Sequence, residues 1–470
     1  MLSRTMNATL LRWGASALFA SSTVFISPLT VSLFADSQVR IVRLSEVDGN
    51  VQFDNSASQR YEKAFLNLPI TEGVKLRSQS DGRAEVEFED GSTLRVVPDT
   101  IVEFPQLSLL DSGGKLSTVH VRQGTAYVHF SGTKNDQLTI TFGNEKLVLT
   151  RAAHLRLEVA QTDATVAVFK GDVQIESPSG TVNVGKRQTA MFDLVDQDRY
   201  RIAKNMEEDP YDAWDKQQDQ YHERYTASNY SSYSPYAYGT ADLSYYGNFF
   251  NAPGYGMMWQ PYLAGAGWDP FMNGSWAFGP GIGYGWVSAY PWGWTPYHYG
   301  SWAFVPRYGW AWQPGSTWAG FNTVPRVRNA PENFVVPQAP VATRNTIVVN
   351  RAPVPELQGK SANKLVIRSN SAGLGVPRGG IANLAKVSEA VAERGSKTTK
   401  IQTVKAPPAN IRSEAAGRSP SSRTSPWAGA RGGAEAGRGV PGRSSAPASA
   451  TPSAAPSAAP ASRSPGGVHR

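Results

Sequence analysis

Between residues 41 and 194 hydrophobic and polar residues alternate with a period of two, and turn residues separate the alternating runs. Residues 84–88 show the pattern most clearly, and the Asp90-Gly91 pair that follows favours a tight hairpin turn. Roughly ten such runs without a helical pattern predict an all-β domain, with a sandwich, a barrel or a solenoid all open. The acidic residues of the same strand are expected to line a solvent-exposed face: Glu85, Glu87 and Glu89.

A second pattern begins at about Tyr230, where aromatic residues replace aliphatic ones. Residues 230–320 contain 10 of the 13 tryptophans and only three charged residues. The block is a repeat of about 26 residues, because Tyr246-Gly247 recurs 53 positions later as Tyr299-Gly300, with a further copy between them. Each copy alternates aromatic and small residues on both sides of a Pro/Gly turn, which predicts three aromatic β-hairpins that stack or curl into a sheet.

The aromatic rings of this block are either packed against one another or presented to a ligand. Indole faces stack on the apolar faces of sugar rings, so an exposed repeat would suit a polysaccharide. The candidates for such stacking are Trp276, Trp302, Trp310 and Trp312. Internal packing is the favoured interpretation, because the block has few other large apolar residues from which to build a core.

The first 35 residues are typical of an export signal. Arg4 and Arg12 precede an apolar run from Trp13 to Ala35, which Pro28 interrupts and polar residues end. We predict a signal peptide over residues 1–35 and a location in the periplasm or cell envelope, or secretion; cleavage is favoured over a retained anchor. If the signal is cleaved, the mature chain has no membrane span.

Two segments connect and extend the β regions. Residues 203–228 predict a helical connector, with aromatic residues near one face. Residues 325–470 are rich in Pro, Ala, Ser and Arg, and predict a largely disordered tail. Lys and Arg exceed Asp and Glu by 21 to 6 in residues 321–470, so this tail is basic and could bind polyanions. Export argues against a nucleic acid as the partner.

The chain shows no pattern of catalytic chemistry. It contains no cysteine, which excludes disulfides and thiol chemistry. The six histidines include no pair at HxH or HxxxH spacing, and no nucleophile elbow or phosphate-binding loop is present. We therefore predict no catalytic, cofactor-binding or metal-binding residues, and a protein that is not an enzyme.

Residues of the first β region resemble a known family. The matching turns and strand ends lie at residues 72–76, 90–94, 121–124, 170–173 and 184–188. They resemble the periplasmic domain of the FecR family over roughly residues 45–190, which implies a sensor or interaction module. Signalling members carry a cytoplasmic segment and a membrane helix before this domain, whereas about 35 residues precede it here.

The aromatic block extends the resemblance. Residues 209–214, 268–270 and 291–302 follow in an order similar to that of uncharacterised exported bacterial proteins. These proteins join a FecR-like domain to a Trp/Tyr/Gly-rich repeat and a disordered tail. The resemblance covers about residues 45–320 and implies architecture and compartment without an activity.

Three functions follow as hypotheses. The first is a non-enzymatic envelope protein whose FecR-like domain binds a protein partner, with a self-packed aromatic module. The second is a protein that binds envelope or extracellular polysaccharide through exposed Trp and Tyr rings. The third is a FecR-type transmembrane signalling regulator. Burial of Trp302 and Trp310 would argue against the second. No sequence pattern specifies an oligomeric state.

Overall fold

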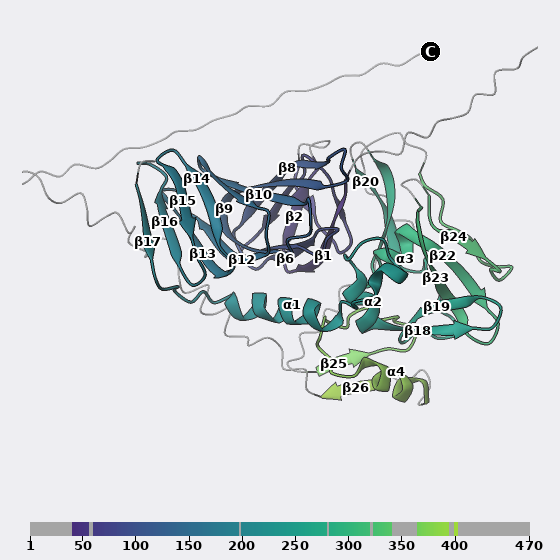
Figure 1. Ribbon diagram of the computed structural model, residues 1–470. Coiled ribbons are helices and arrows are strands. Elements are labelled where there is room, and N and C mark those ends of the chain that lie inside the picture. The colour runs from purple at the N-terminus through teal and green to yellow at the C-terminus, as the bar shows by residue number, and fades with distance from the viewer. Residues whose placement is uncertain are drawn as a thin grey trace, which may run out of the picture. The chain divides into compact units, whose positions relative to one another are not determined.

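The computed structural model describes residues 40–55, 60–196, 199–279, 282–319, 323–340, 364–393 and 399–402 (Figure 1). The predicted signal peptide over residues 1–35 and the end of the tail lie outside these ranges. The described chain is mainly β, as its alternating pattern predicts. None of its described helices is long and apolar enough to cross a membrane.

The β-domain consists of seventeen strands that enclose one hydrophobic core. The strands are β1 (Val42–Asp48), β2 (Val51–Asp54), β3 (Glu62–Lys63), β4 (Pro69–Ile70), β5 (Lys75–Ser78), β6 (Arg83–Glu87), β7 (Thr93–Val96), β8 (Ile101–Leu109), β9 (Lys115–Phe130), β10 (Gln137–Phe142), β11 (Glu145–Leu149), β12 (Ala153–Val159), β13 (Asp163–Lys170), β14 (Val173–Ser177), β15 (Gly180–Val184), β16 (Thr189–Asp193) and β17 (Tyr200–Ala203).

The strands form two pleated layers that share β9. One layer has the order β4-β1-β6-β7-β9-β12-β13-β16-β17, and the other has the order β3-β2-β5-β8-β9-β10-β11-β14-β15. Strand β9 crosses from the second layer to the first at Gly124, which has φ +88°. A Cβ at this glycine would lie 2.5 Å from the Cα of Thr100, so the crossing requires a residue without a side chain.

Helix α1 (Asp212–Tyr225) lies beneath the first layer, within the predicted connector (Figure 1). A 3₁₀ turn (Tyr230–Ser232) and helix α2 (Thr240–Tyr246) follow it. This segment covers the face of β6 that the alternation predicts to be exposed. That prediction is wrong, because the three acidic residues of this region are buried: Glu85, Glu87 and Glu89.

Three aromatic hairpins follow, as the repeat predicts. They consist of β18 (Gly247–Ala252) with β19 (Gly256–Pro261), β20 (Gly274–Gly279) with β21 (Gly283–Ser288), and β22 (Tyr299–Val305) with β23 (Gly309–Trp318). Helix α3 (Thr295–His298) precedes the third hairpin, and β24 (Arg326–Arg328) pairs with β22. The first and third hairpins join in one sheet where Trp259 lies opposite Trp312.

The second hairpin packs on the β-domain instead. Ala277 of β20 and Val287 of β21 belong to the hydrophobic core of the β-domain. The Asn67 side-chain amide donates to the carbonyl oxygens of Ser288 and Tyr290 at 2.9 and 2.7 Å. The β-domain and the aromatic module are therefore joined by apolar packing and by buried hydrogen bonds.

Each hairpin places a glycine under the indole of its partner strand. Gly247 lies under Trp259, Gly274 under Trp286 and Gly300 under Trp312, and the members of each pair are twelve positions apart. A Cβ at the first two glycines would lie within 2.5 Å of an indole carbon, and a Cβ at the third within 2.8 Å of an indole nitrogen. The repeated glycine is thus a packing requirement of the repeated tryptophan.

We expect Gly274→Ala to destabilise the protein by roughly 1–3 kcal/mol, because the added methyl group overlaps the buried Trp286 ring. Urea unfolding followed by tryptophan fluorescence measures the loss. Gly267→Ala is the matched control, since its Cβ would meet nothing closer than 3.6 Å and no positive φ is involved. Equal stability of the two variants would contradict the packing role.

Part of the predicted tail is folded. Helix α4 (Leu384–Glu393) and strands β25 (Lys364–Ile367) and β26 (Thr399–Gln402) lie within it. Between β25 and α4 the chain packs on the aromatic module, where the Tyr246 hydroxyl donates to the Val376 carbonyl at 2.7 Å. The predicted tail therefore contains a folded segment over residues 364–393, and apolar side chains from Ile367 onward pack in the aromatic core. The buried ones are Ile367, Ala372, Val376, Ile381, Leu384 and Val391.

Candidate functional site

The four tryptophans predicted to stack on sugars are all buried: Trp276 at 0%, Trp302 at 0%, Trp310 at 4% and Trp312 at 0% exposure. Two of them also use their indole N–H groups internally. Trp302 donates to the Pro296 carbonyl at 2.9 Å, and Trp312 donates to the Tyr299 carbonyl at 2.8 Å. The prediction of exposed stacking rings is therefore wrong. The large apolar area of these rings forms the core of the module itself.

The most unusual polar feature lies where the β-domain, the aromatic module and the folded part of the tail meet. Five charged side chains are buried together there, and we call them the junction cluster: Arg43, Glu85, Glu87, Asp242 and Arg378. They come from β1, β6, α2 and the segment before α4. Buried charges are tolerated where they are paired and hydrogen-bonded, and this cluster meets that condition.

Two arginines hold the junction cluster together. Arg43 contacts Glu87 at 3.2 Å and Asp242 at 2.6 Å, so it links the β-domain to α2. Arg378 contacts Glu85 at 2.7 Å and Asp242 through two hydrogen bonds of 3.0 and 3.1 Å. This fork geometry is specific to arginine. A single carboxylate, Asp242, thus receives one arginine from the β-domain and one from the tail.

The protonation states of these acids differ because their partners differ. Burial would raise the pKa of Asp242, but the charges of Arg378 and Arg43 hold it below its usual value. The pKa of Glu85 is likewise held well below the ordinary value by His222, Arg378 and Arg95, in spite of burial. For Glu87 burial prevails and the pKa is raised.

Helix α1 is fixed to the β-domain by a third arginine, Arg95. Arg95 of β7 contacts Glu85 at 2.8 Å and reaches Asp215 and Asp219 of α1, both at 2.7 Å. Burial would raise the pKa of Asp219, but the hydrogen bond with His129 and the charge of Arg95 hold it well below the usual range. The helix therefore presents ionised carboxylates to the first layer.

The sequence contains one usable signal for this arrangement. Asp242 is one of only three charged residues in the neutral aromatic block, and an isolated charge in such a block requires a partner. Nothing in the local pattern around Arg378 distinguishes it from the other arginines of the tail. Its role follows only from the packing of the folded tail segment.

Glu46, beside the junction cluster, gives a pH dependence of stability. Burial raises its pKa from 4.5 to about 7, although the charge of Arg378 opposes the shift, and its Oε2 has no hydrogen-bond partner among the described residues. Folding therefore takes up a proton between pH 4.5 and about 7, so the contribution of Glu46 to stability falls as pH rises through this window.

We expect Glu46→Gln to be more stable than the wild type at pH 8 and to lose this advantage at pH 5. Urea unfolding of both proteins at the two pH values measures the difference in the free energy of unfolding. Glu223→Gln serves as a control, because Glu223 is exposed on α1. A gap between wild type and Glu46→Gln that stays constant with pH would contradict the prediction.

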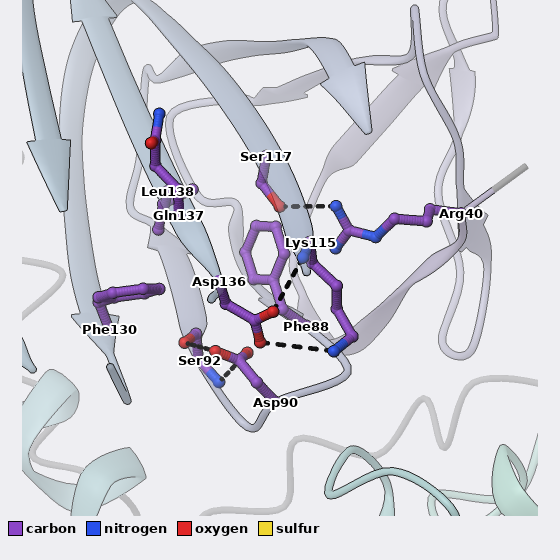
Figure 2. Close-up of a pocket in the computed structure, with 10 residues that line it drawn as sticks. All are labelled: Arg40, Phe88, Asp90, Ser92, Lys115, Ser117, Phe130, Asp136, Gln137 and Leu138. Carbon is purple, nitrogen blue, oxygen red and sulfur yellow. Dashed lines mark hydrogen bonds and ion pairs between the residues drawn. The ribbon is translucent and has the colours of Figure 1, made fainter. Parts of the chain in front are cut away.

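A small hollow lies at the edge of the β-domain (Figure 2). Its charged residues are already paired with one another or with nearby groups. Lys115 contacts Asp136 at 3.4 Å, Arg40 donates to Ser117 at 3.0 Å, and Ser92 donates to Asp90 at 2.7 Å. Each of these charged side chains thus has a hydrogen-bond or ion-pair partner, and the remaining lining is Phe88, Phe130, Gln137 and Leu138.

The far edge of the first layer is exposed and apolar. Strand β17 pairs with β16 on one side, and no described strand pairs with its other side. Tyr200 and Ile202 of this strand are 44% and 40% exposed, and Val195 of the preceding turn is 63% exposed. An unpaired edge with apolar side chains is a surface to which an extended segment can add.

Two family models match parts of the described chain. The model of the FecR protein family matches residues 74–174. This match confirms the FecR resemblance that the sequence predicted. The model of a family of unknown function, DUF6600, matches residues 240–342, which begin at α2 and include all three aromatic hairpins. The chain thus combines a FecR-like β-domain with a DUF6600-like aromatic module.

Solved structures add a partial similarity. Two crystal structures of a candidate anti-sigma factor from Parabacteroides distasonis ATCC 8503, at 1.65 and 2.50 Å resolution, match with 12% and 11% identity and a TM-score of 0.24. The match covers 28% of this chain and spans only 59% of the length of those structures. At this score it carries no argument about function. No curated protein matches the chain.

Proposed function

We propose that this chain is a non-enzymatic, exported protein of the cell envelope whose FecR-like β-domain binds a protein partner. The family match supports a module of the signalling or regulator type. The observation that carries the proposal is how the two parts use their apolar groups. The aromatic module buries its rings within the chain, whereas the β-domain leaves the apolar edge strand β17 open.

In this proposal the aromatic module has a structural role: it packs on the β-domain and stabilises it. It supplies apolar residues to the β-domain core and an aspartate to the junction cluster. The partner then adds an extended segment to the free edge of β17. The backbone of this segment would pair with the strand, and its apolar side chains would pack on Tyr200 and Ile202. Arg201 and Lys204 lie on or beside this strand and favour a segment with acidic side chains.

A site-specific photocrosslinker in place of Ile202 tests the partner hypothesis in intact cells. We expect an adduct between this chain and another envelope protein. The matched control places the crosslinker at Tyr308, which is 45% exposed in the aromatic module, and should not give this adduct. A second substitution, Tyr200→Lys, should reduce the adduct. Self-crosslinks alone, or the same adduct from both positions, would contradict binding at β17.

Export is proposed from the apolar run that ends at Ala35. We expect the purified mature protein to begin near Asp36. N-terminal sequencing of protein from a periplasmic fraction measures the start site, and osmotic release is compared with that of a cytoplasmic marker. Recovery of the chain with the cytoplasmic marker and with Met1 intact would contradict export.

A further inference from the structure

Helix α1 and the first layer of the β-domain bring together a group of side chains that the proposed function does not use. His129 of β9 and His154 of β12 are cross-strand neighbours, and their ring centroids lie 5.5 Å apart. Asp219 of α1 faces both rings. One ligand atom from each of these three residues lies within 4.8 Å of the other two, so the three side chains form a candidate group of metal ligands.

The hydrogen bonds around His154 determine which of its atoms face the group. Its Nε2 lies 2.8 Å from the Oδ2 of Asp215, and a proton shared with this carboxylate belongs on Nε2. The Nδ1 of a neutral ring then carries a lone pair, yet it lies 3.4 Å from the Oδ2 of Asp219. The Nδ1 of His129 lies 3.1 Å from the same oxygen. Both ring nitrogens thus converge on one oxygen of Asp219, and a cation bound there would replace the proton of the His129–Asp219 hydrogen bond.

The separations suit a transition metal ion. A metal bound at about 2.0–2.1 Å by nitrogen and oxygen ligands places neighbouring ligand atoms roughly 3.0–3.4 Å apart in octahedral or tetrahedral geometry. The two nitrogen–oxygen separations, 3.1 and 3.4 Å, lie within this range, and the two histidine nitrogens lie within 4.8 Å of each other. Two imidazoles with one carboxylate favour Zn²⁺, Ni²⁺ or Cu²⁺ over Mg²⁺ or Ca²⁺, which prefer oxygen ligands.

The surrounding residues orient the ligands and place several carboxylates beside them. Asp215 fixes the His154 ring, and Arg95 holds the Oδ1 of Asp219 at 2.7 Å, which leaves Oδ2 directed at the imidazoles. Carboxylates in this outer position are typical of histidine metal sites. Arg95 also contacts Glu85 and Asp215, so three carboxylates surround one guanidinium. A bound divalent cation would add positive charge where Asp215 and Asp219 share Arg95.

We propose that His129, His154 and Asp219 form a binding site for a divalent transition metal ion of the Zn²⁺ class. The ion would fasten α1 to two strands of the β-domain. Since α1 also contributes His222 beside Glu85 and Tyr221 beside Asp242, the ion stabilises the junction through the same helix. Three protein ligands leave a fourth position for water or for one side chain of a partner.

The test uses the full-length exported chain, stripped with EDTA and then supplied with ZnCl₂ or CoCl₂. We expect Zn²⁺ to raise the melting temperature by roughly 5 °C or more at saturating concentration. Co²⁺ should give the visible absorption of a bound ion. Isothermal titration should show one site, with the affinity reduced at least tenfold in His129→Asn/His154→Asn.

His120→Asn is the matched control, because His120 lies on the same strand and its ring contacts Thr141 instead. It should bind the ion like the wild type. Circular dichroism without metal confirms that each variant is folded, and Asp219→Asn tests the carboxylate separately. Absence of a Zn²⁺ shift and of a Co²⁺ spectrum in the wild type would overturn the proposal. So would wild-type affinity in the double variant. Neither result affects partner binding at β17.

Discussion

Arg378→Ala is expected to lower the free energy of unfolding by roughly 3 kcal/mol or more, because it removes one partner from a buried, hydrogen-bonded ion cluster. Asp242 retains Arg43, and Glu85 retains Arg95 and His222, which places the loss near the lower end of the range for broken buried pairs. Urea unfolding measures the change.

The same substitution should release the folded tail segment before the β-domain unfolds. Arg378 joins residues 364–393 to two acids of other elements, so its loss should speed trypsin cleavage after Lys364 and Arg368. Arg368→Ala is the matched control for stability, since Arg368 belongs to the same segment and is exposed. Arg378→Lys keeps the charge without the fork and should fall between. Stability of Arg378→Ala within about 0.5 kcal/mol of the wild type would contradict a role for the cluster.

Trp302→Ala is expected to lower the free energy of unfolding by roughly 3–5 kcal/mol, the range for a large aromatic side chain removed from a packed core. The Trp302 ring is fully buried and contacts the rings of Trp268, Trp292 and Tyr297. Its truncation also leaves the Pro296 carbonyl without its donor. Urea unfolding, monitored by circular dichroism so that the lost fluorophore does not interfere, measures the effect.

The control for Trp302→Ala is Tyr308→Ala in the same hairpin. Tyr308 is 45% exposed and stacks only on Phe250 among the described ring contacts, so its loss should cost less than about 1 kcal/mol. The pair also separates packing from ligand binding. If Trp302→Ala were as stable as the wild type but lost affinity for a polysaccharide, the ring would be a binding residue and the self-packed module would be wrong.

Local periodicity predicted the secondary structure well. The alternation over residues 41–194 predicted strands, and the repeat predicted three hairpins, of which the first and third have their Pro/Gly turns within the described residues. The glycine–tryptophan spacing of twelve residues is itself present in the sequence, because both members of each pair belong to one hairpin. A hairpin closes within a short stretch of chain, so a local pattern contains most of what specifies it.

The faces of these elements could not be predicted in the same way. Period two shows that Glu85 and Glu87 share one side of β6, but it does not show that α1 and α2 cover that side. The aromatic repeat likewise left open whether Trp302 packs or binds. Burial depends on which distant segment lies on the surface, and the segments concerned are far apart in the chain.

The sequence patterns did not reveal the proposed metal site of His129, His154 and Asp219 for a related reason. The histidines show no metal spacing along the sequence, yet β9 and β12 pair in a register that places His154 opposite His129. The packing of α1 on these two strands brings Asp219 next to both histidine rings. A search for short motifs finds ligands that share one element, whereas these three residues come from three elements.

The sequence by itself determined the strands, the turns and the aromatic hairpins, because hydrogen-bonded hairpins and alternating faces are set by neighbouring residues. Tertiary structure decided which charged residues are buried, which tryptophans are hidden and which part of the tail folds. The clearest case is the contact of Arg378 with Glu85, residues 293 positions apart. A buried ion pair forms only when each partner finds the other, and no local pattern specifies such a pair.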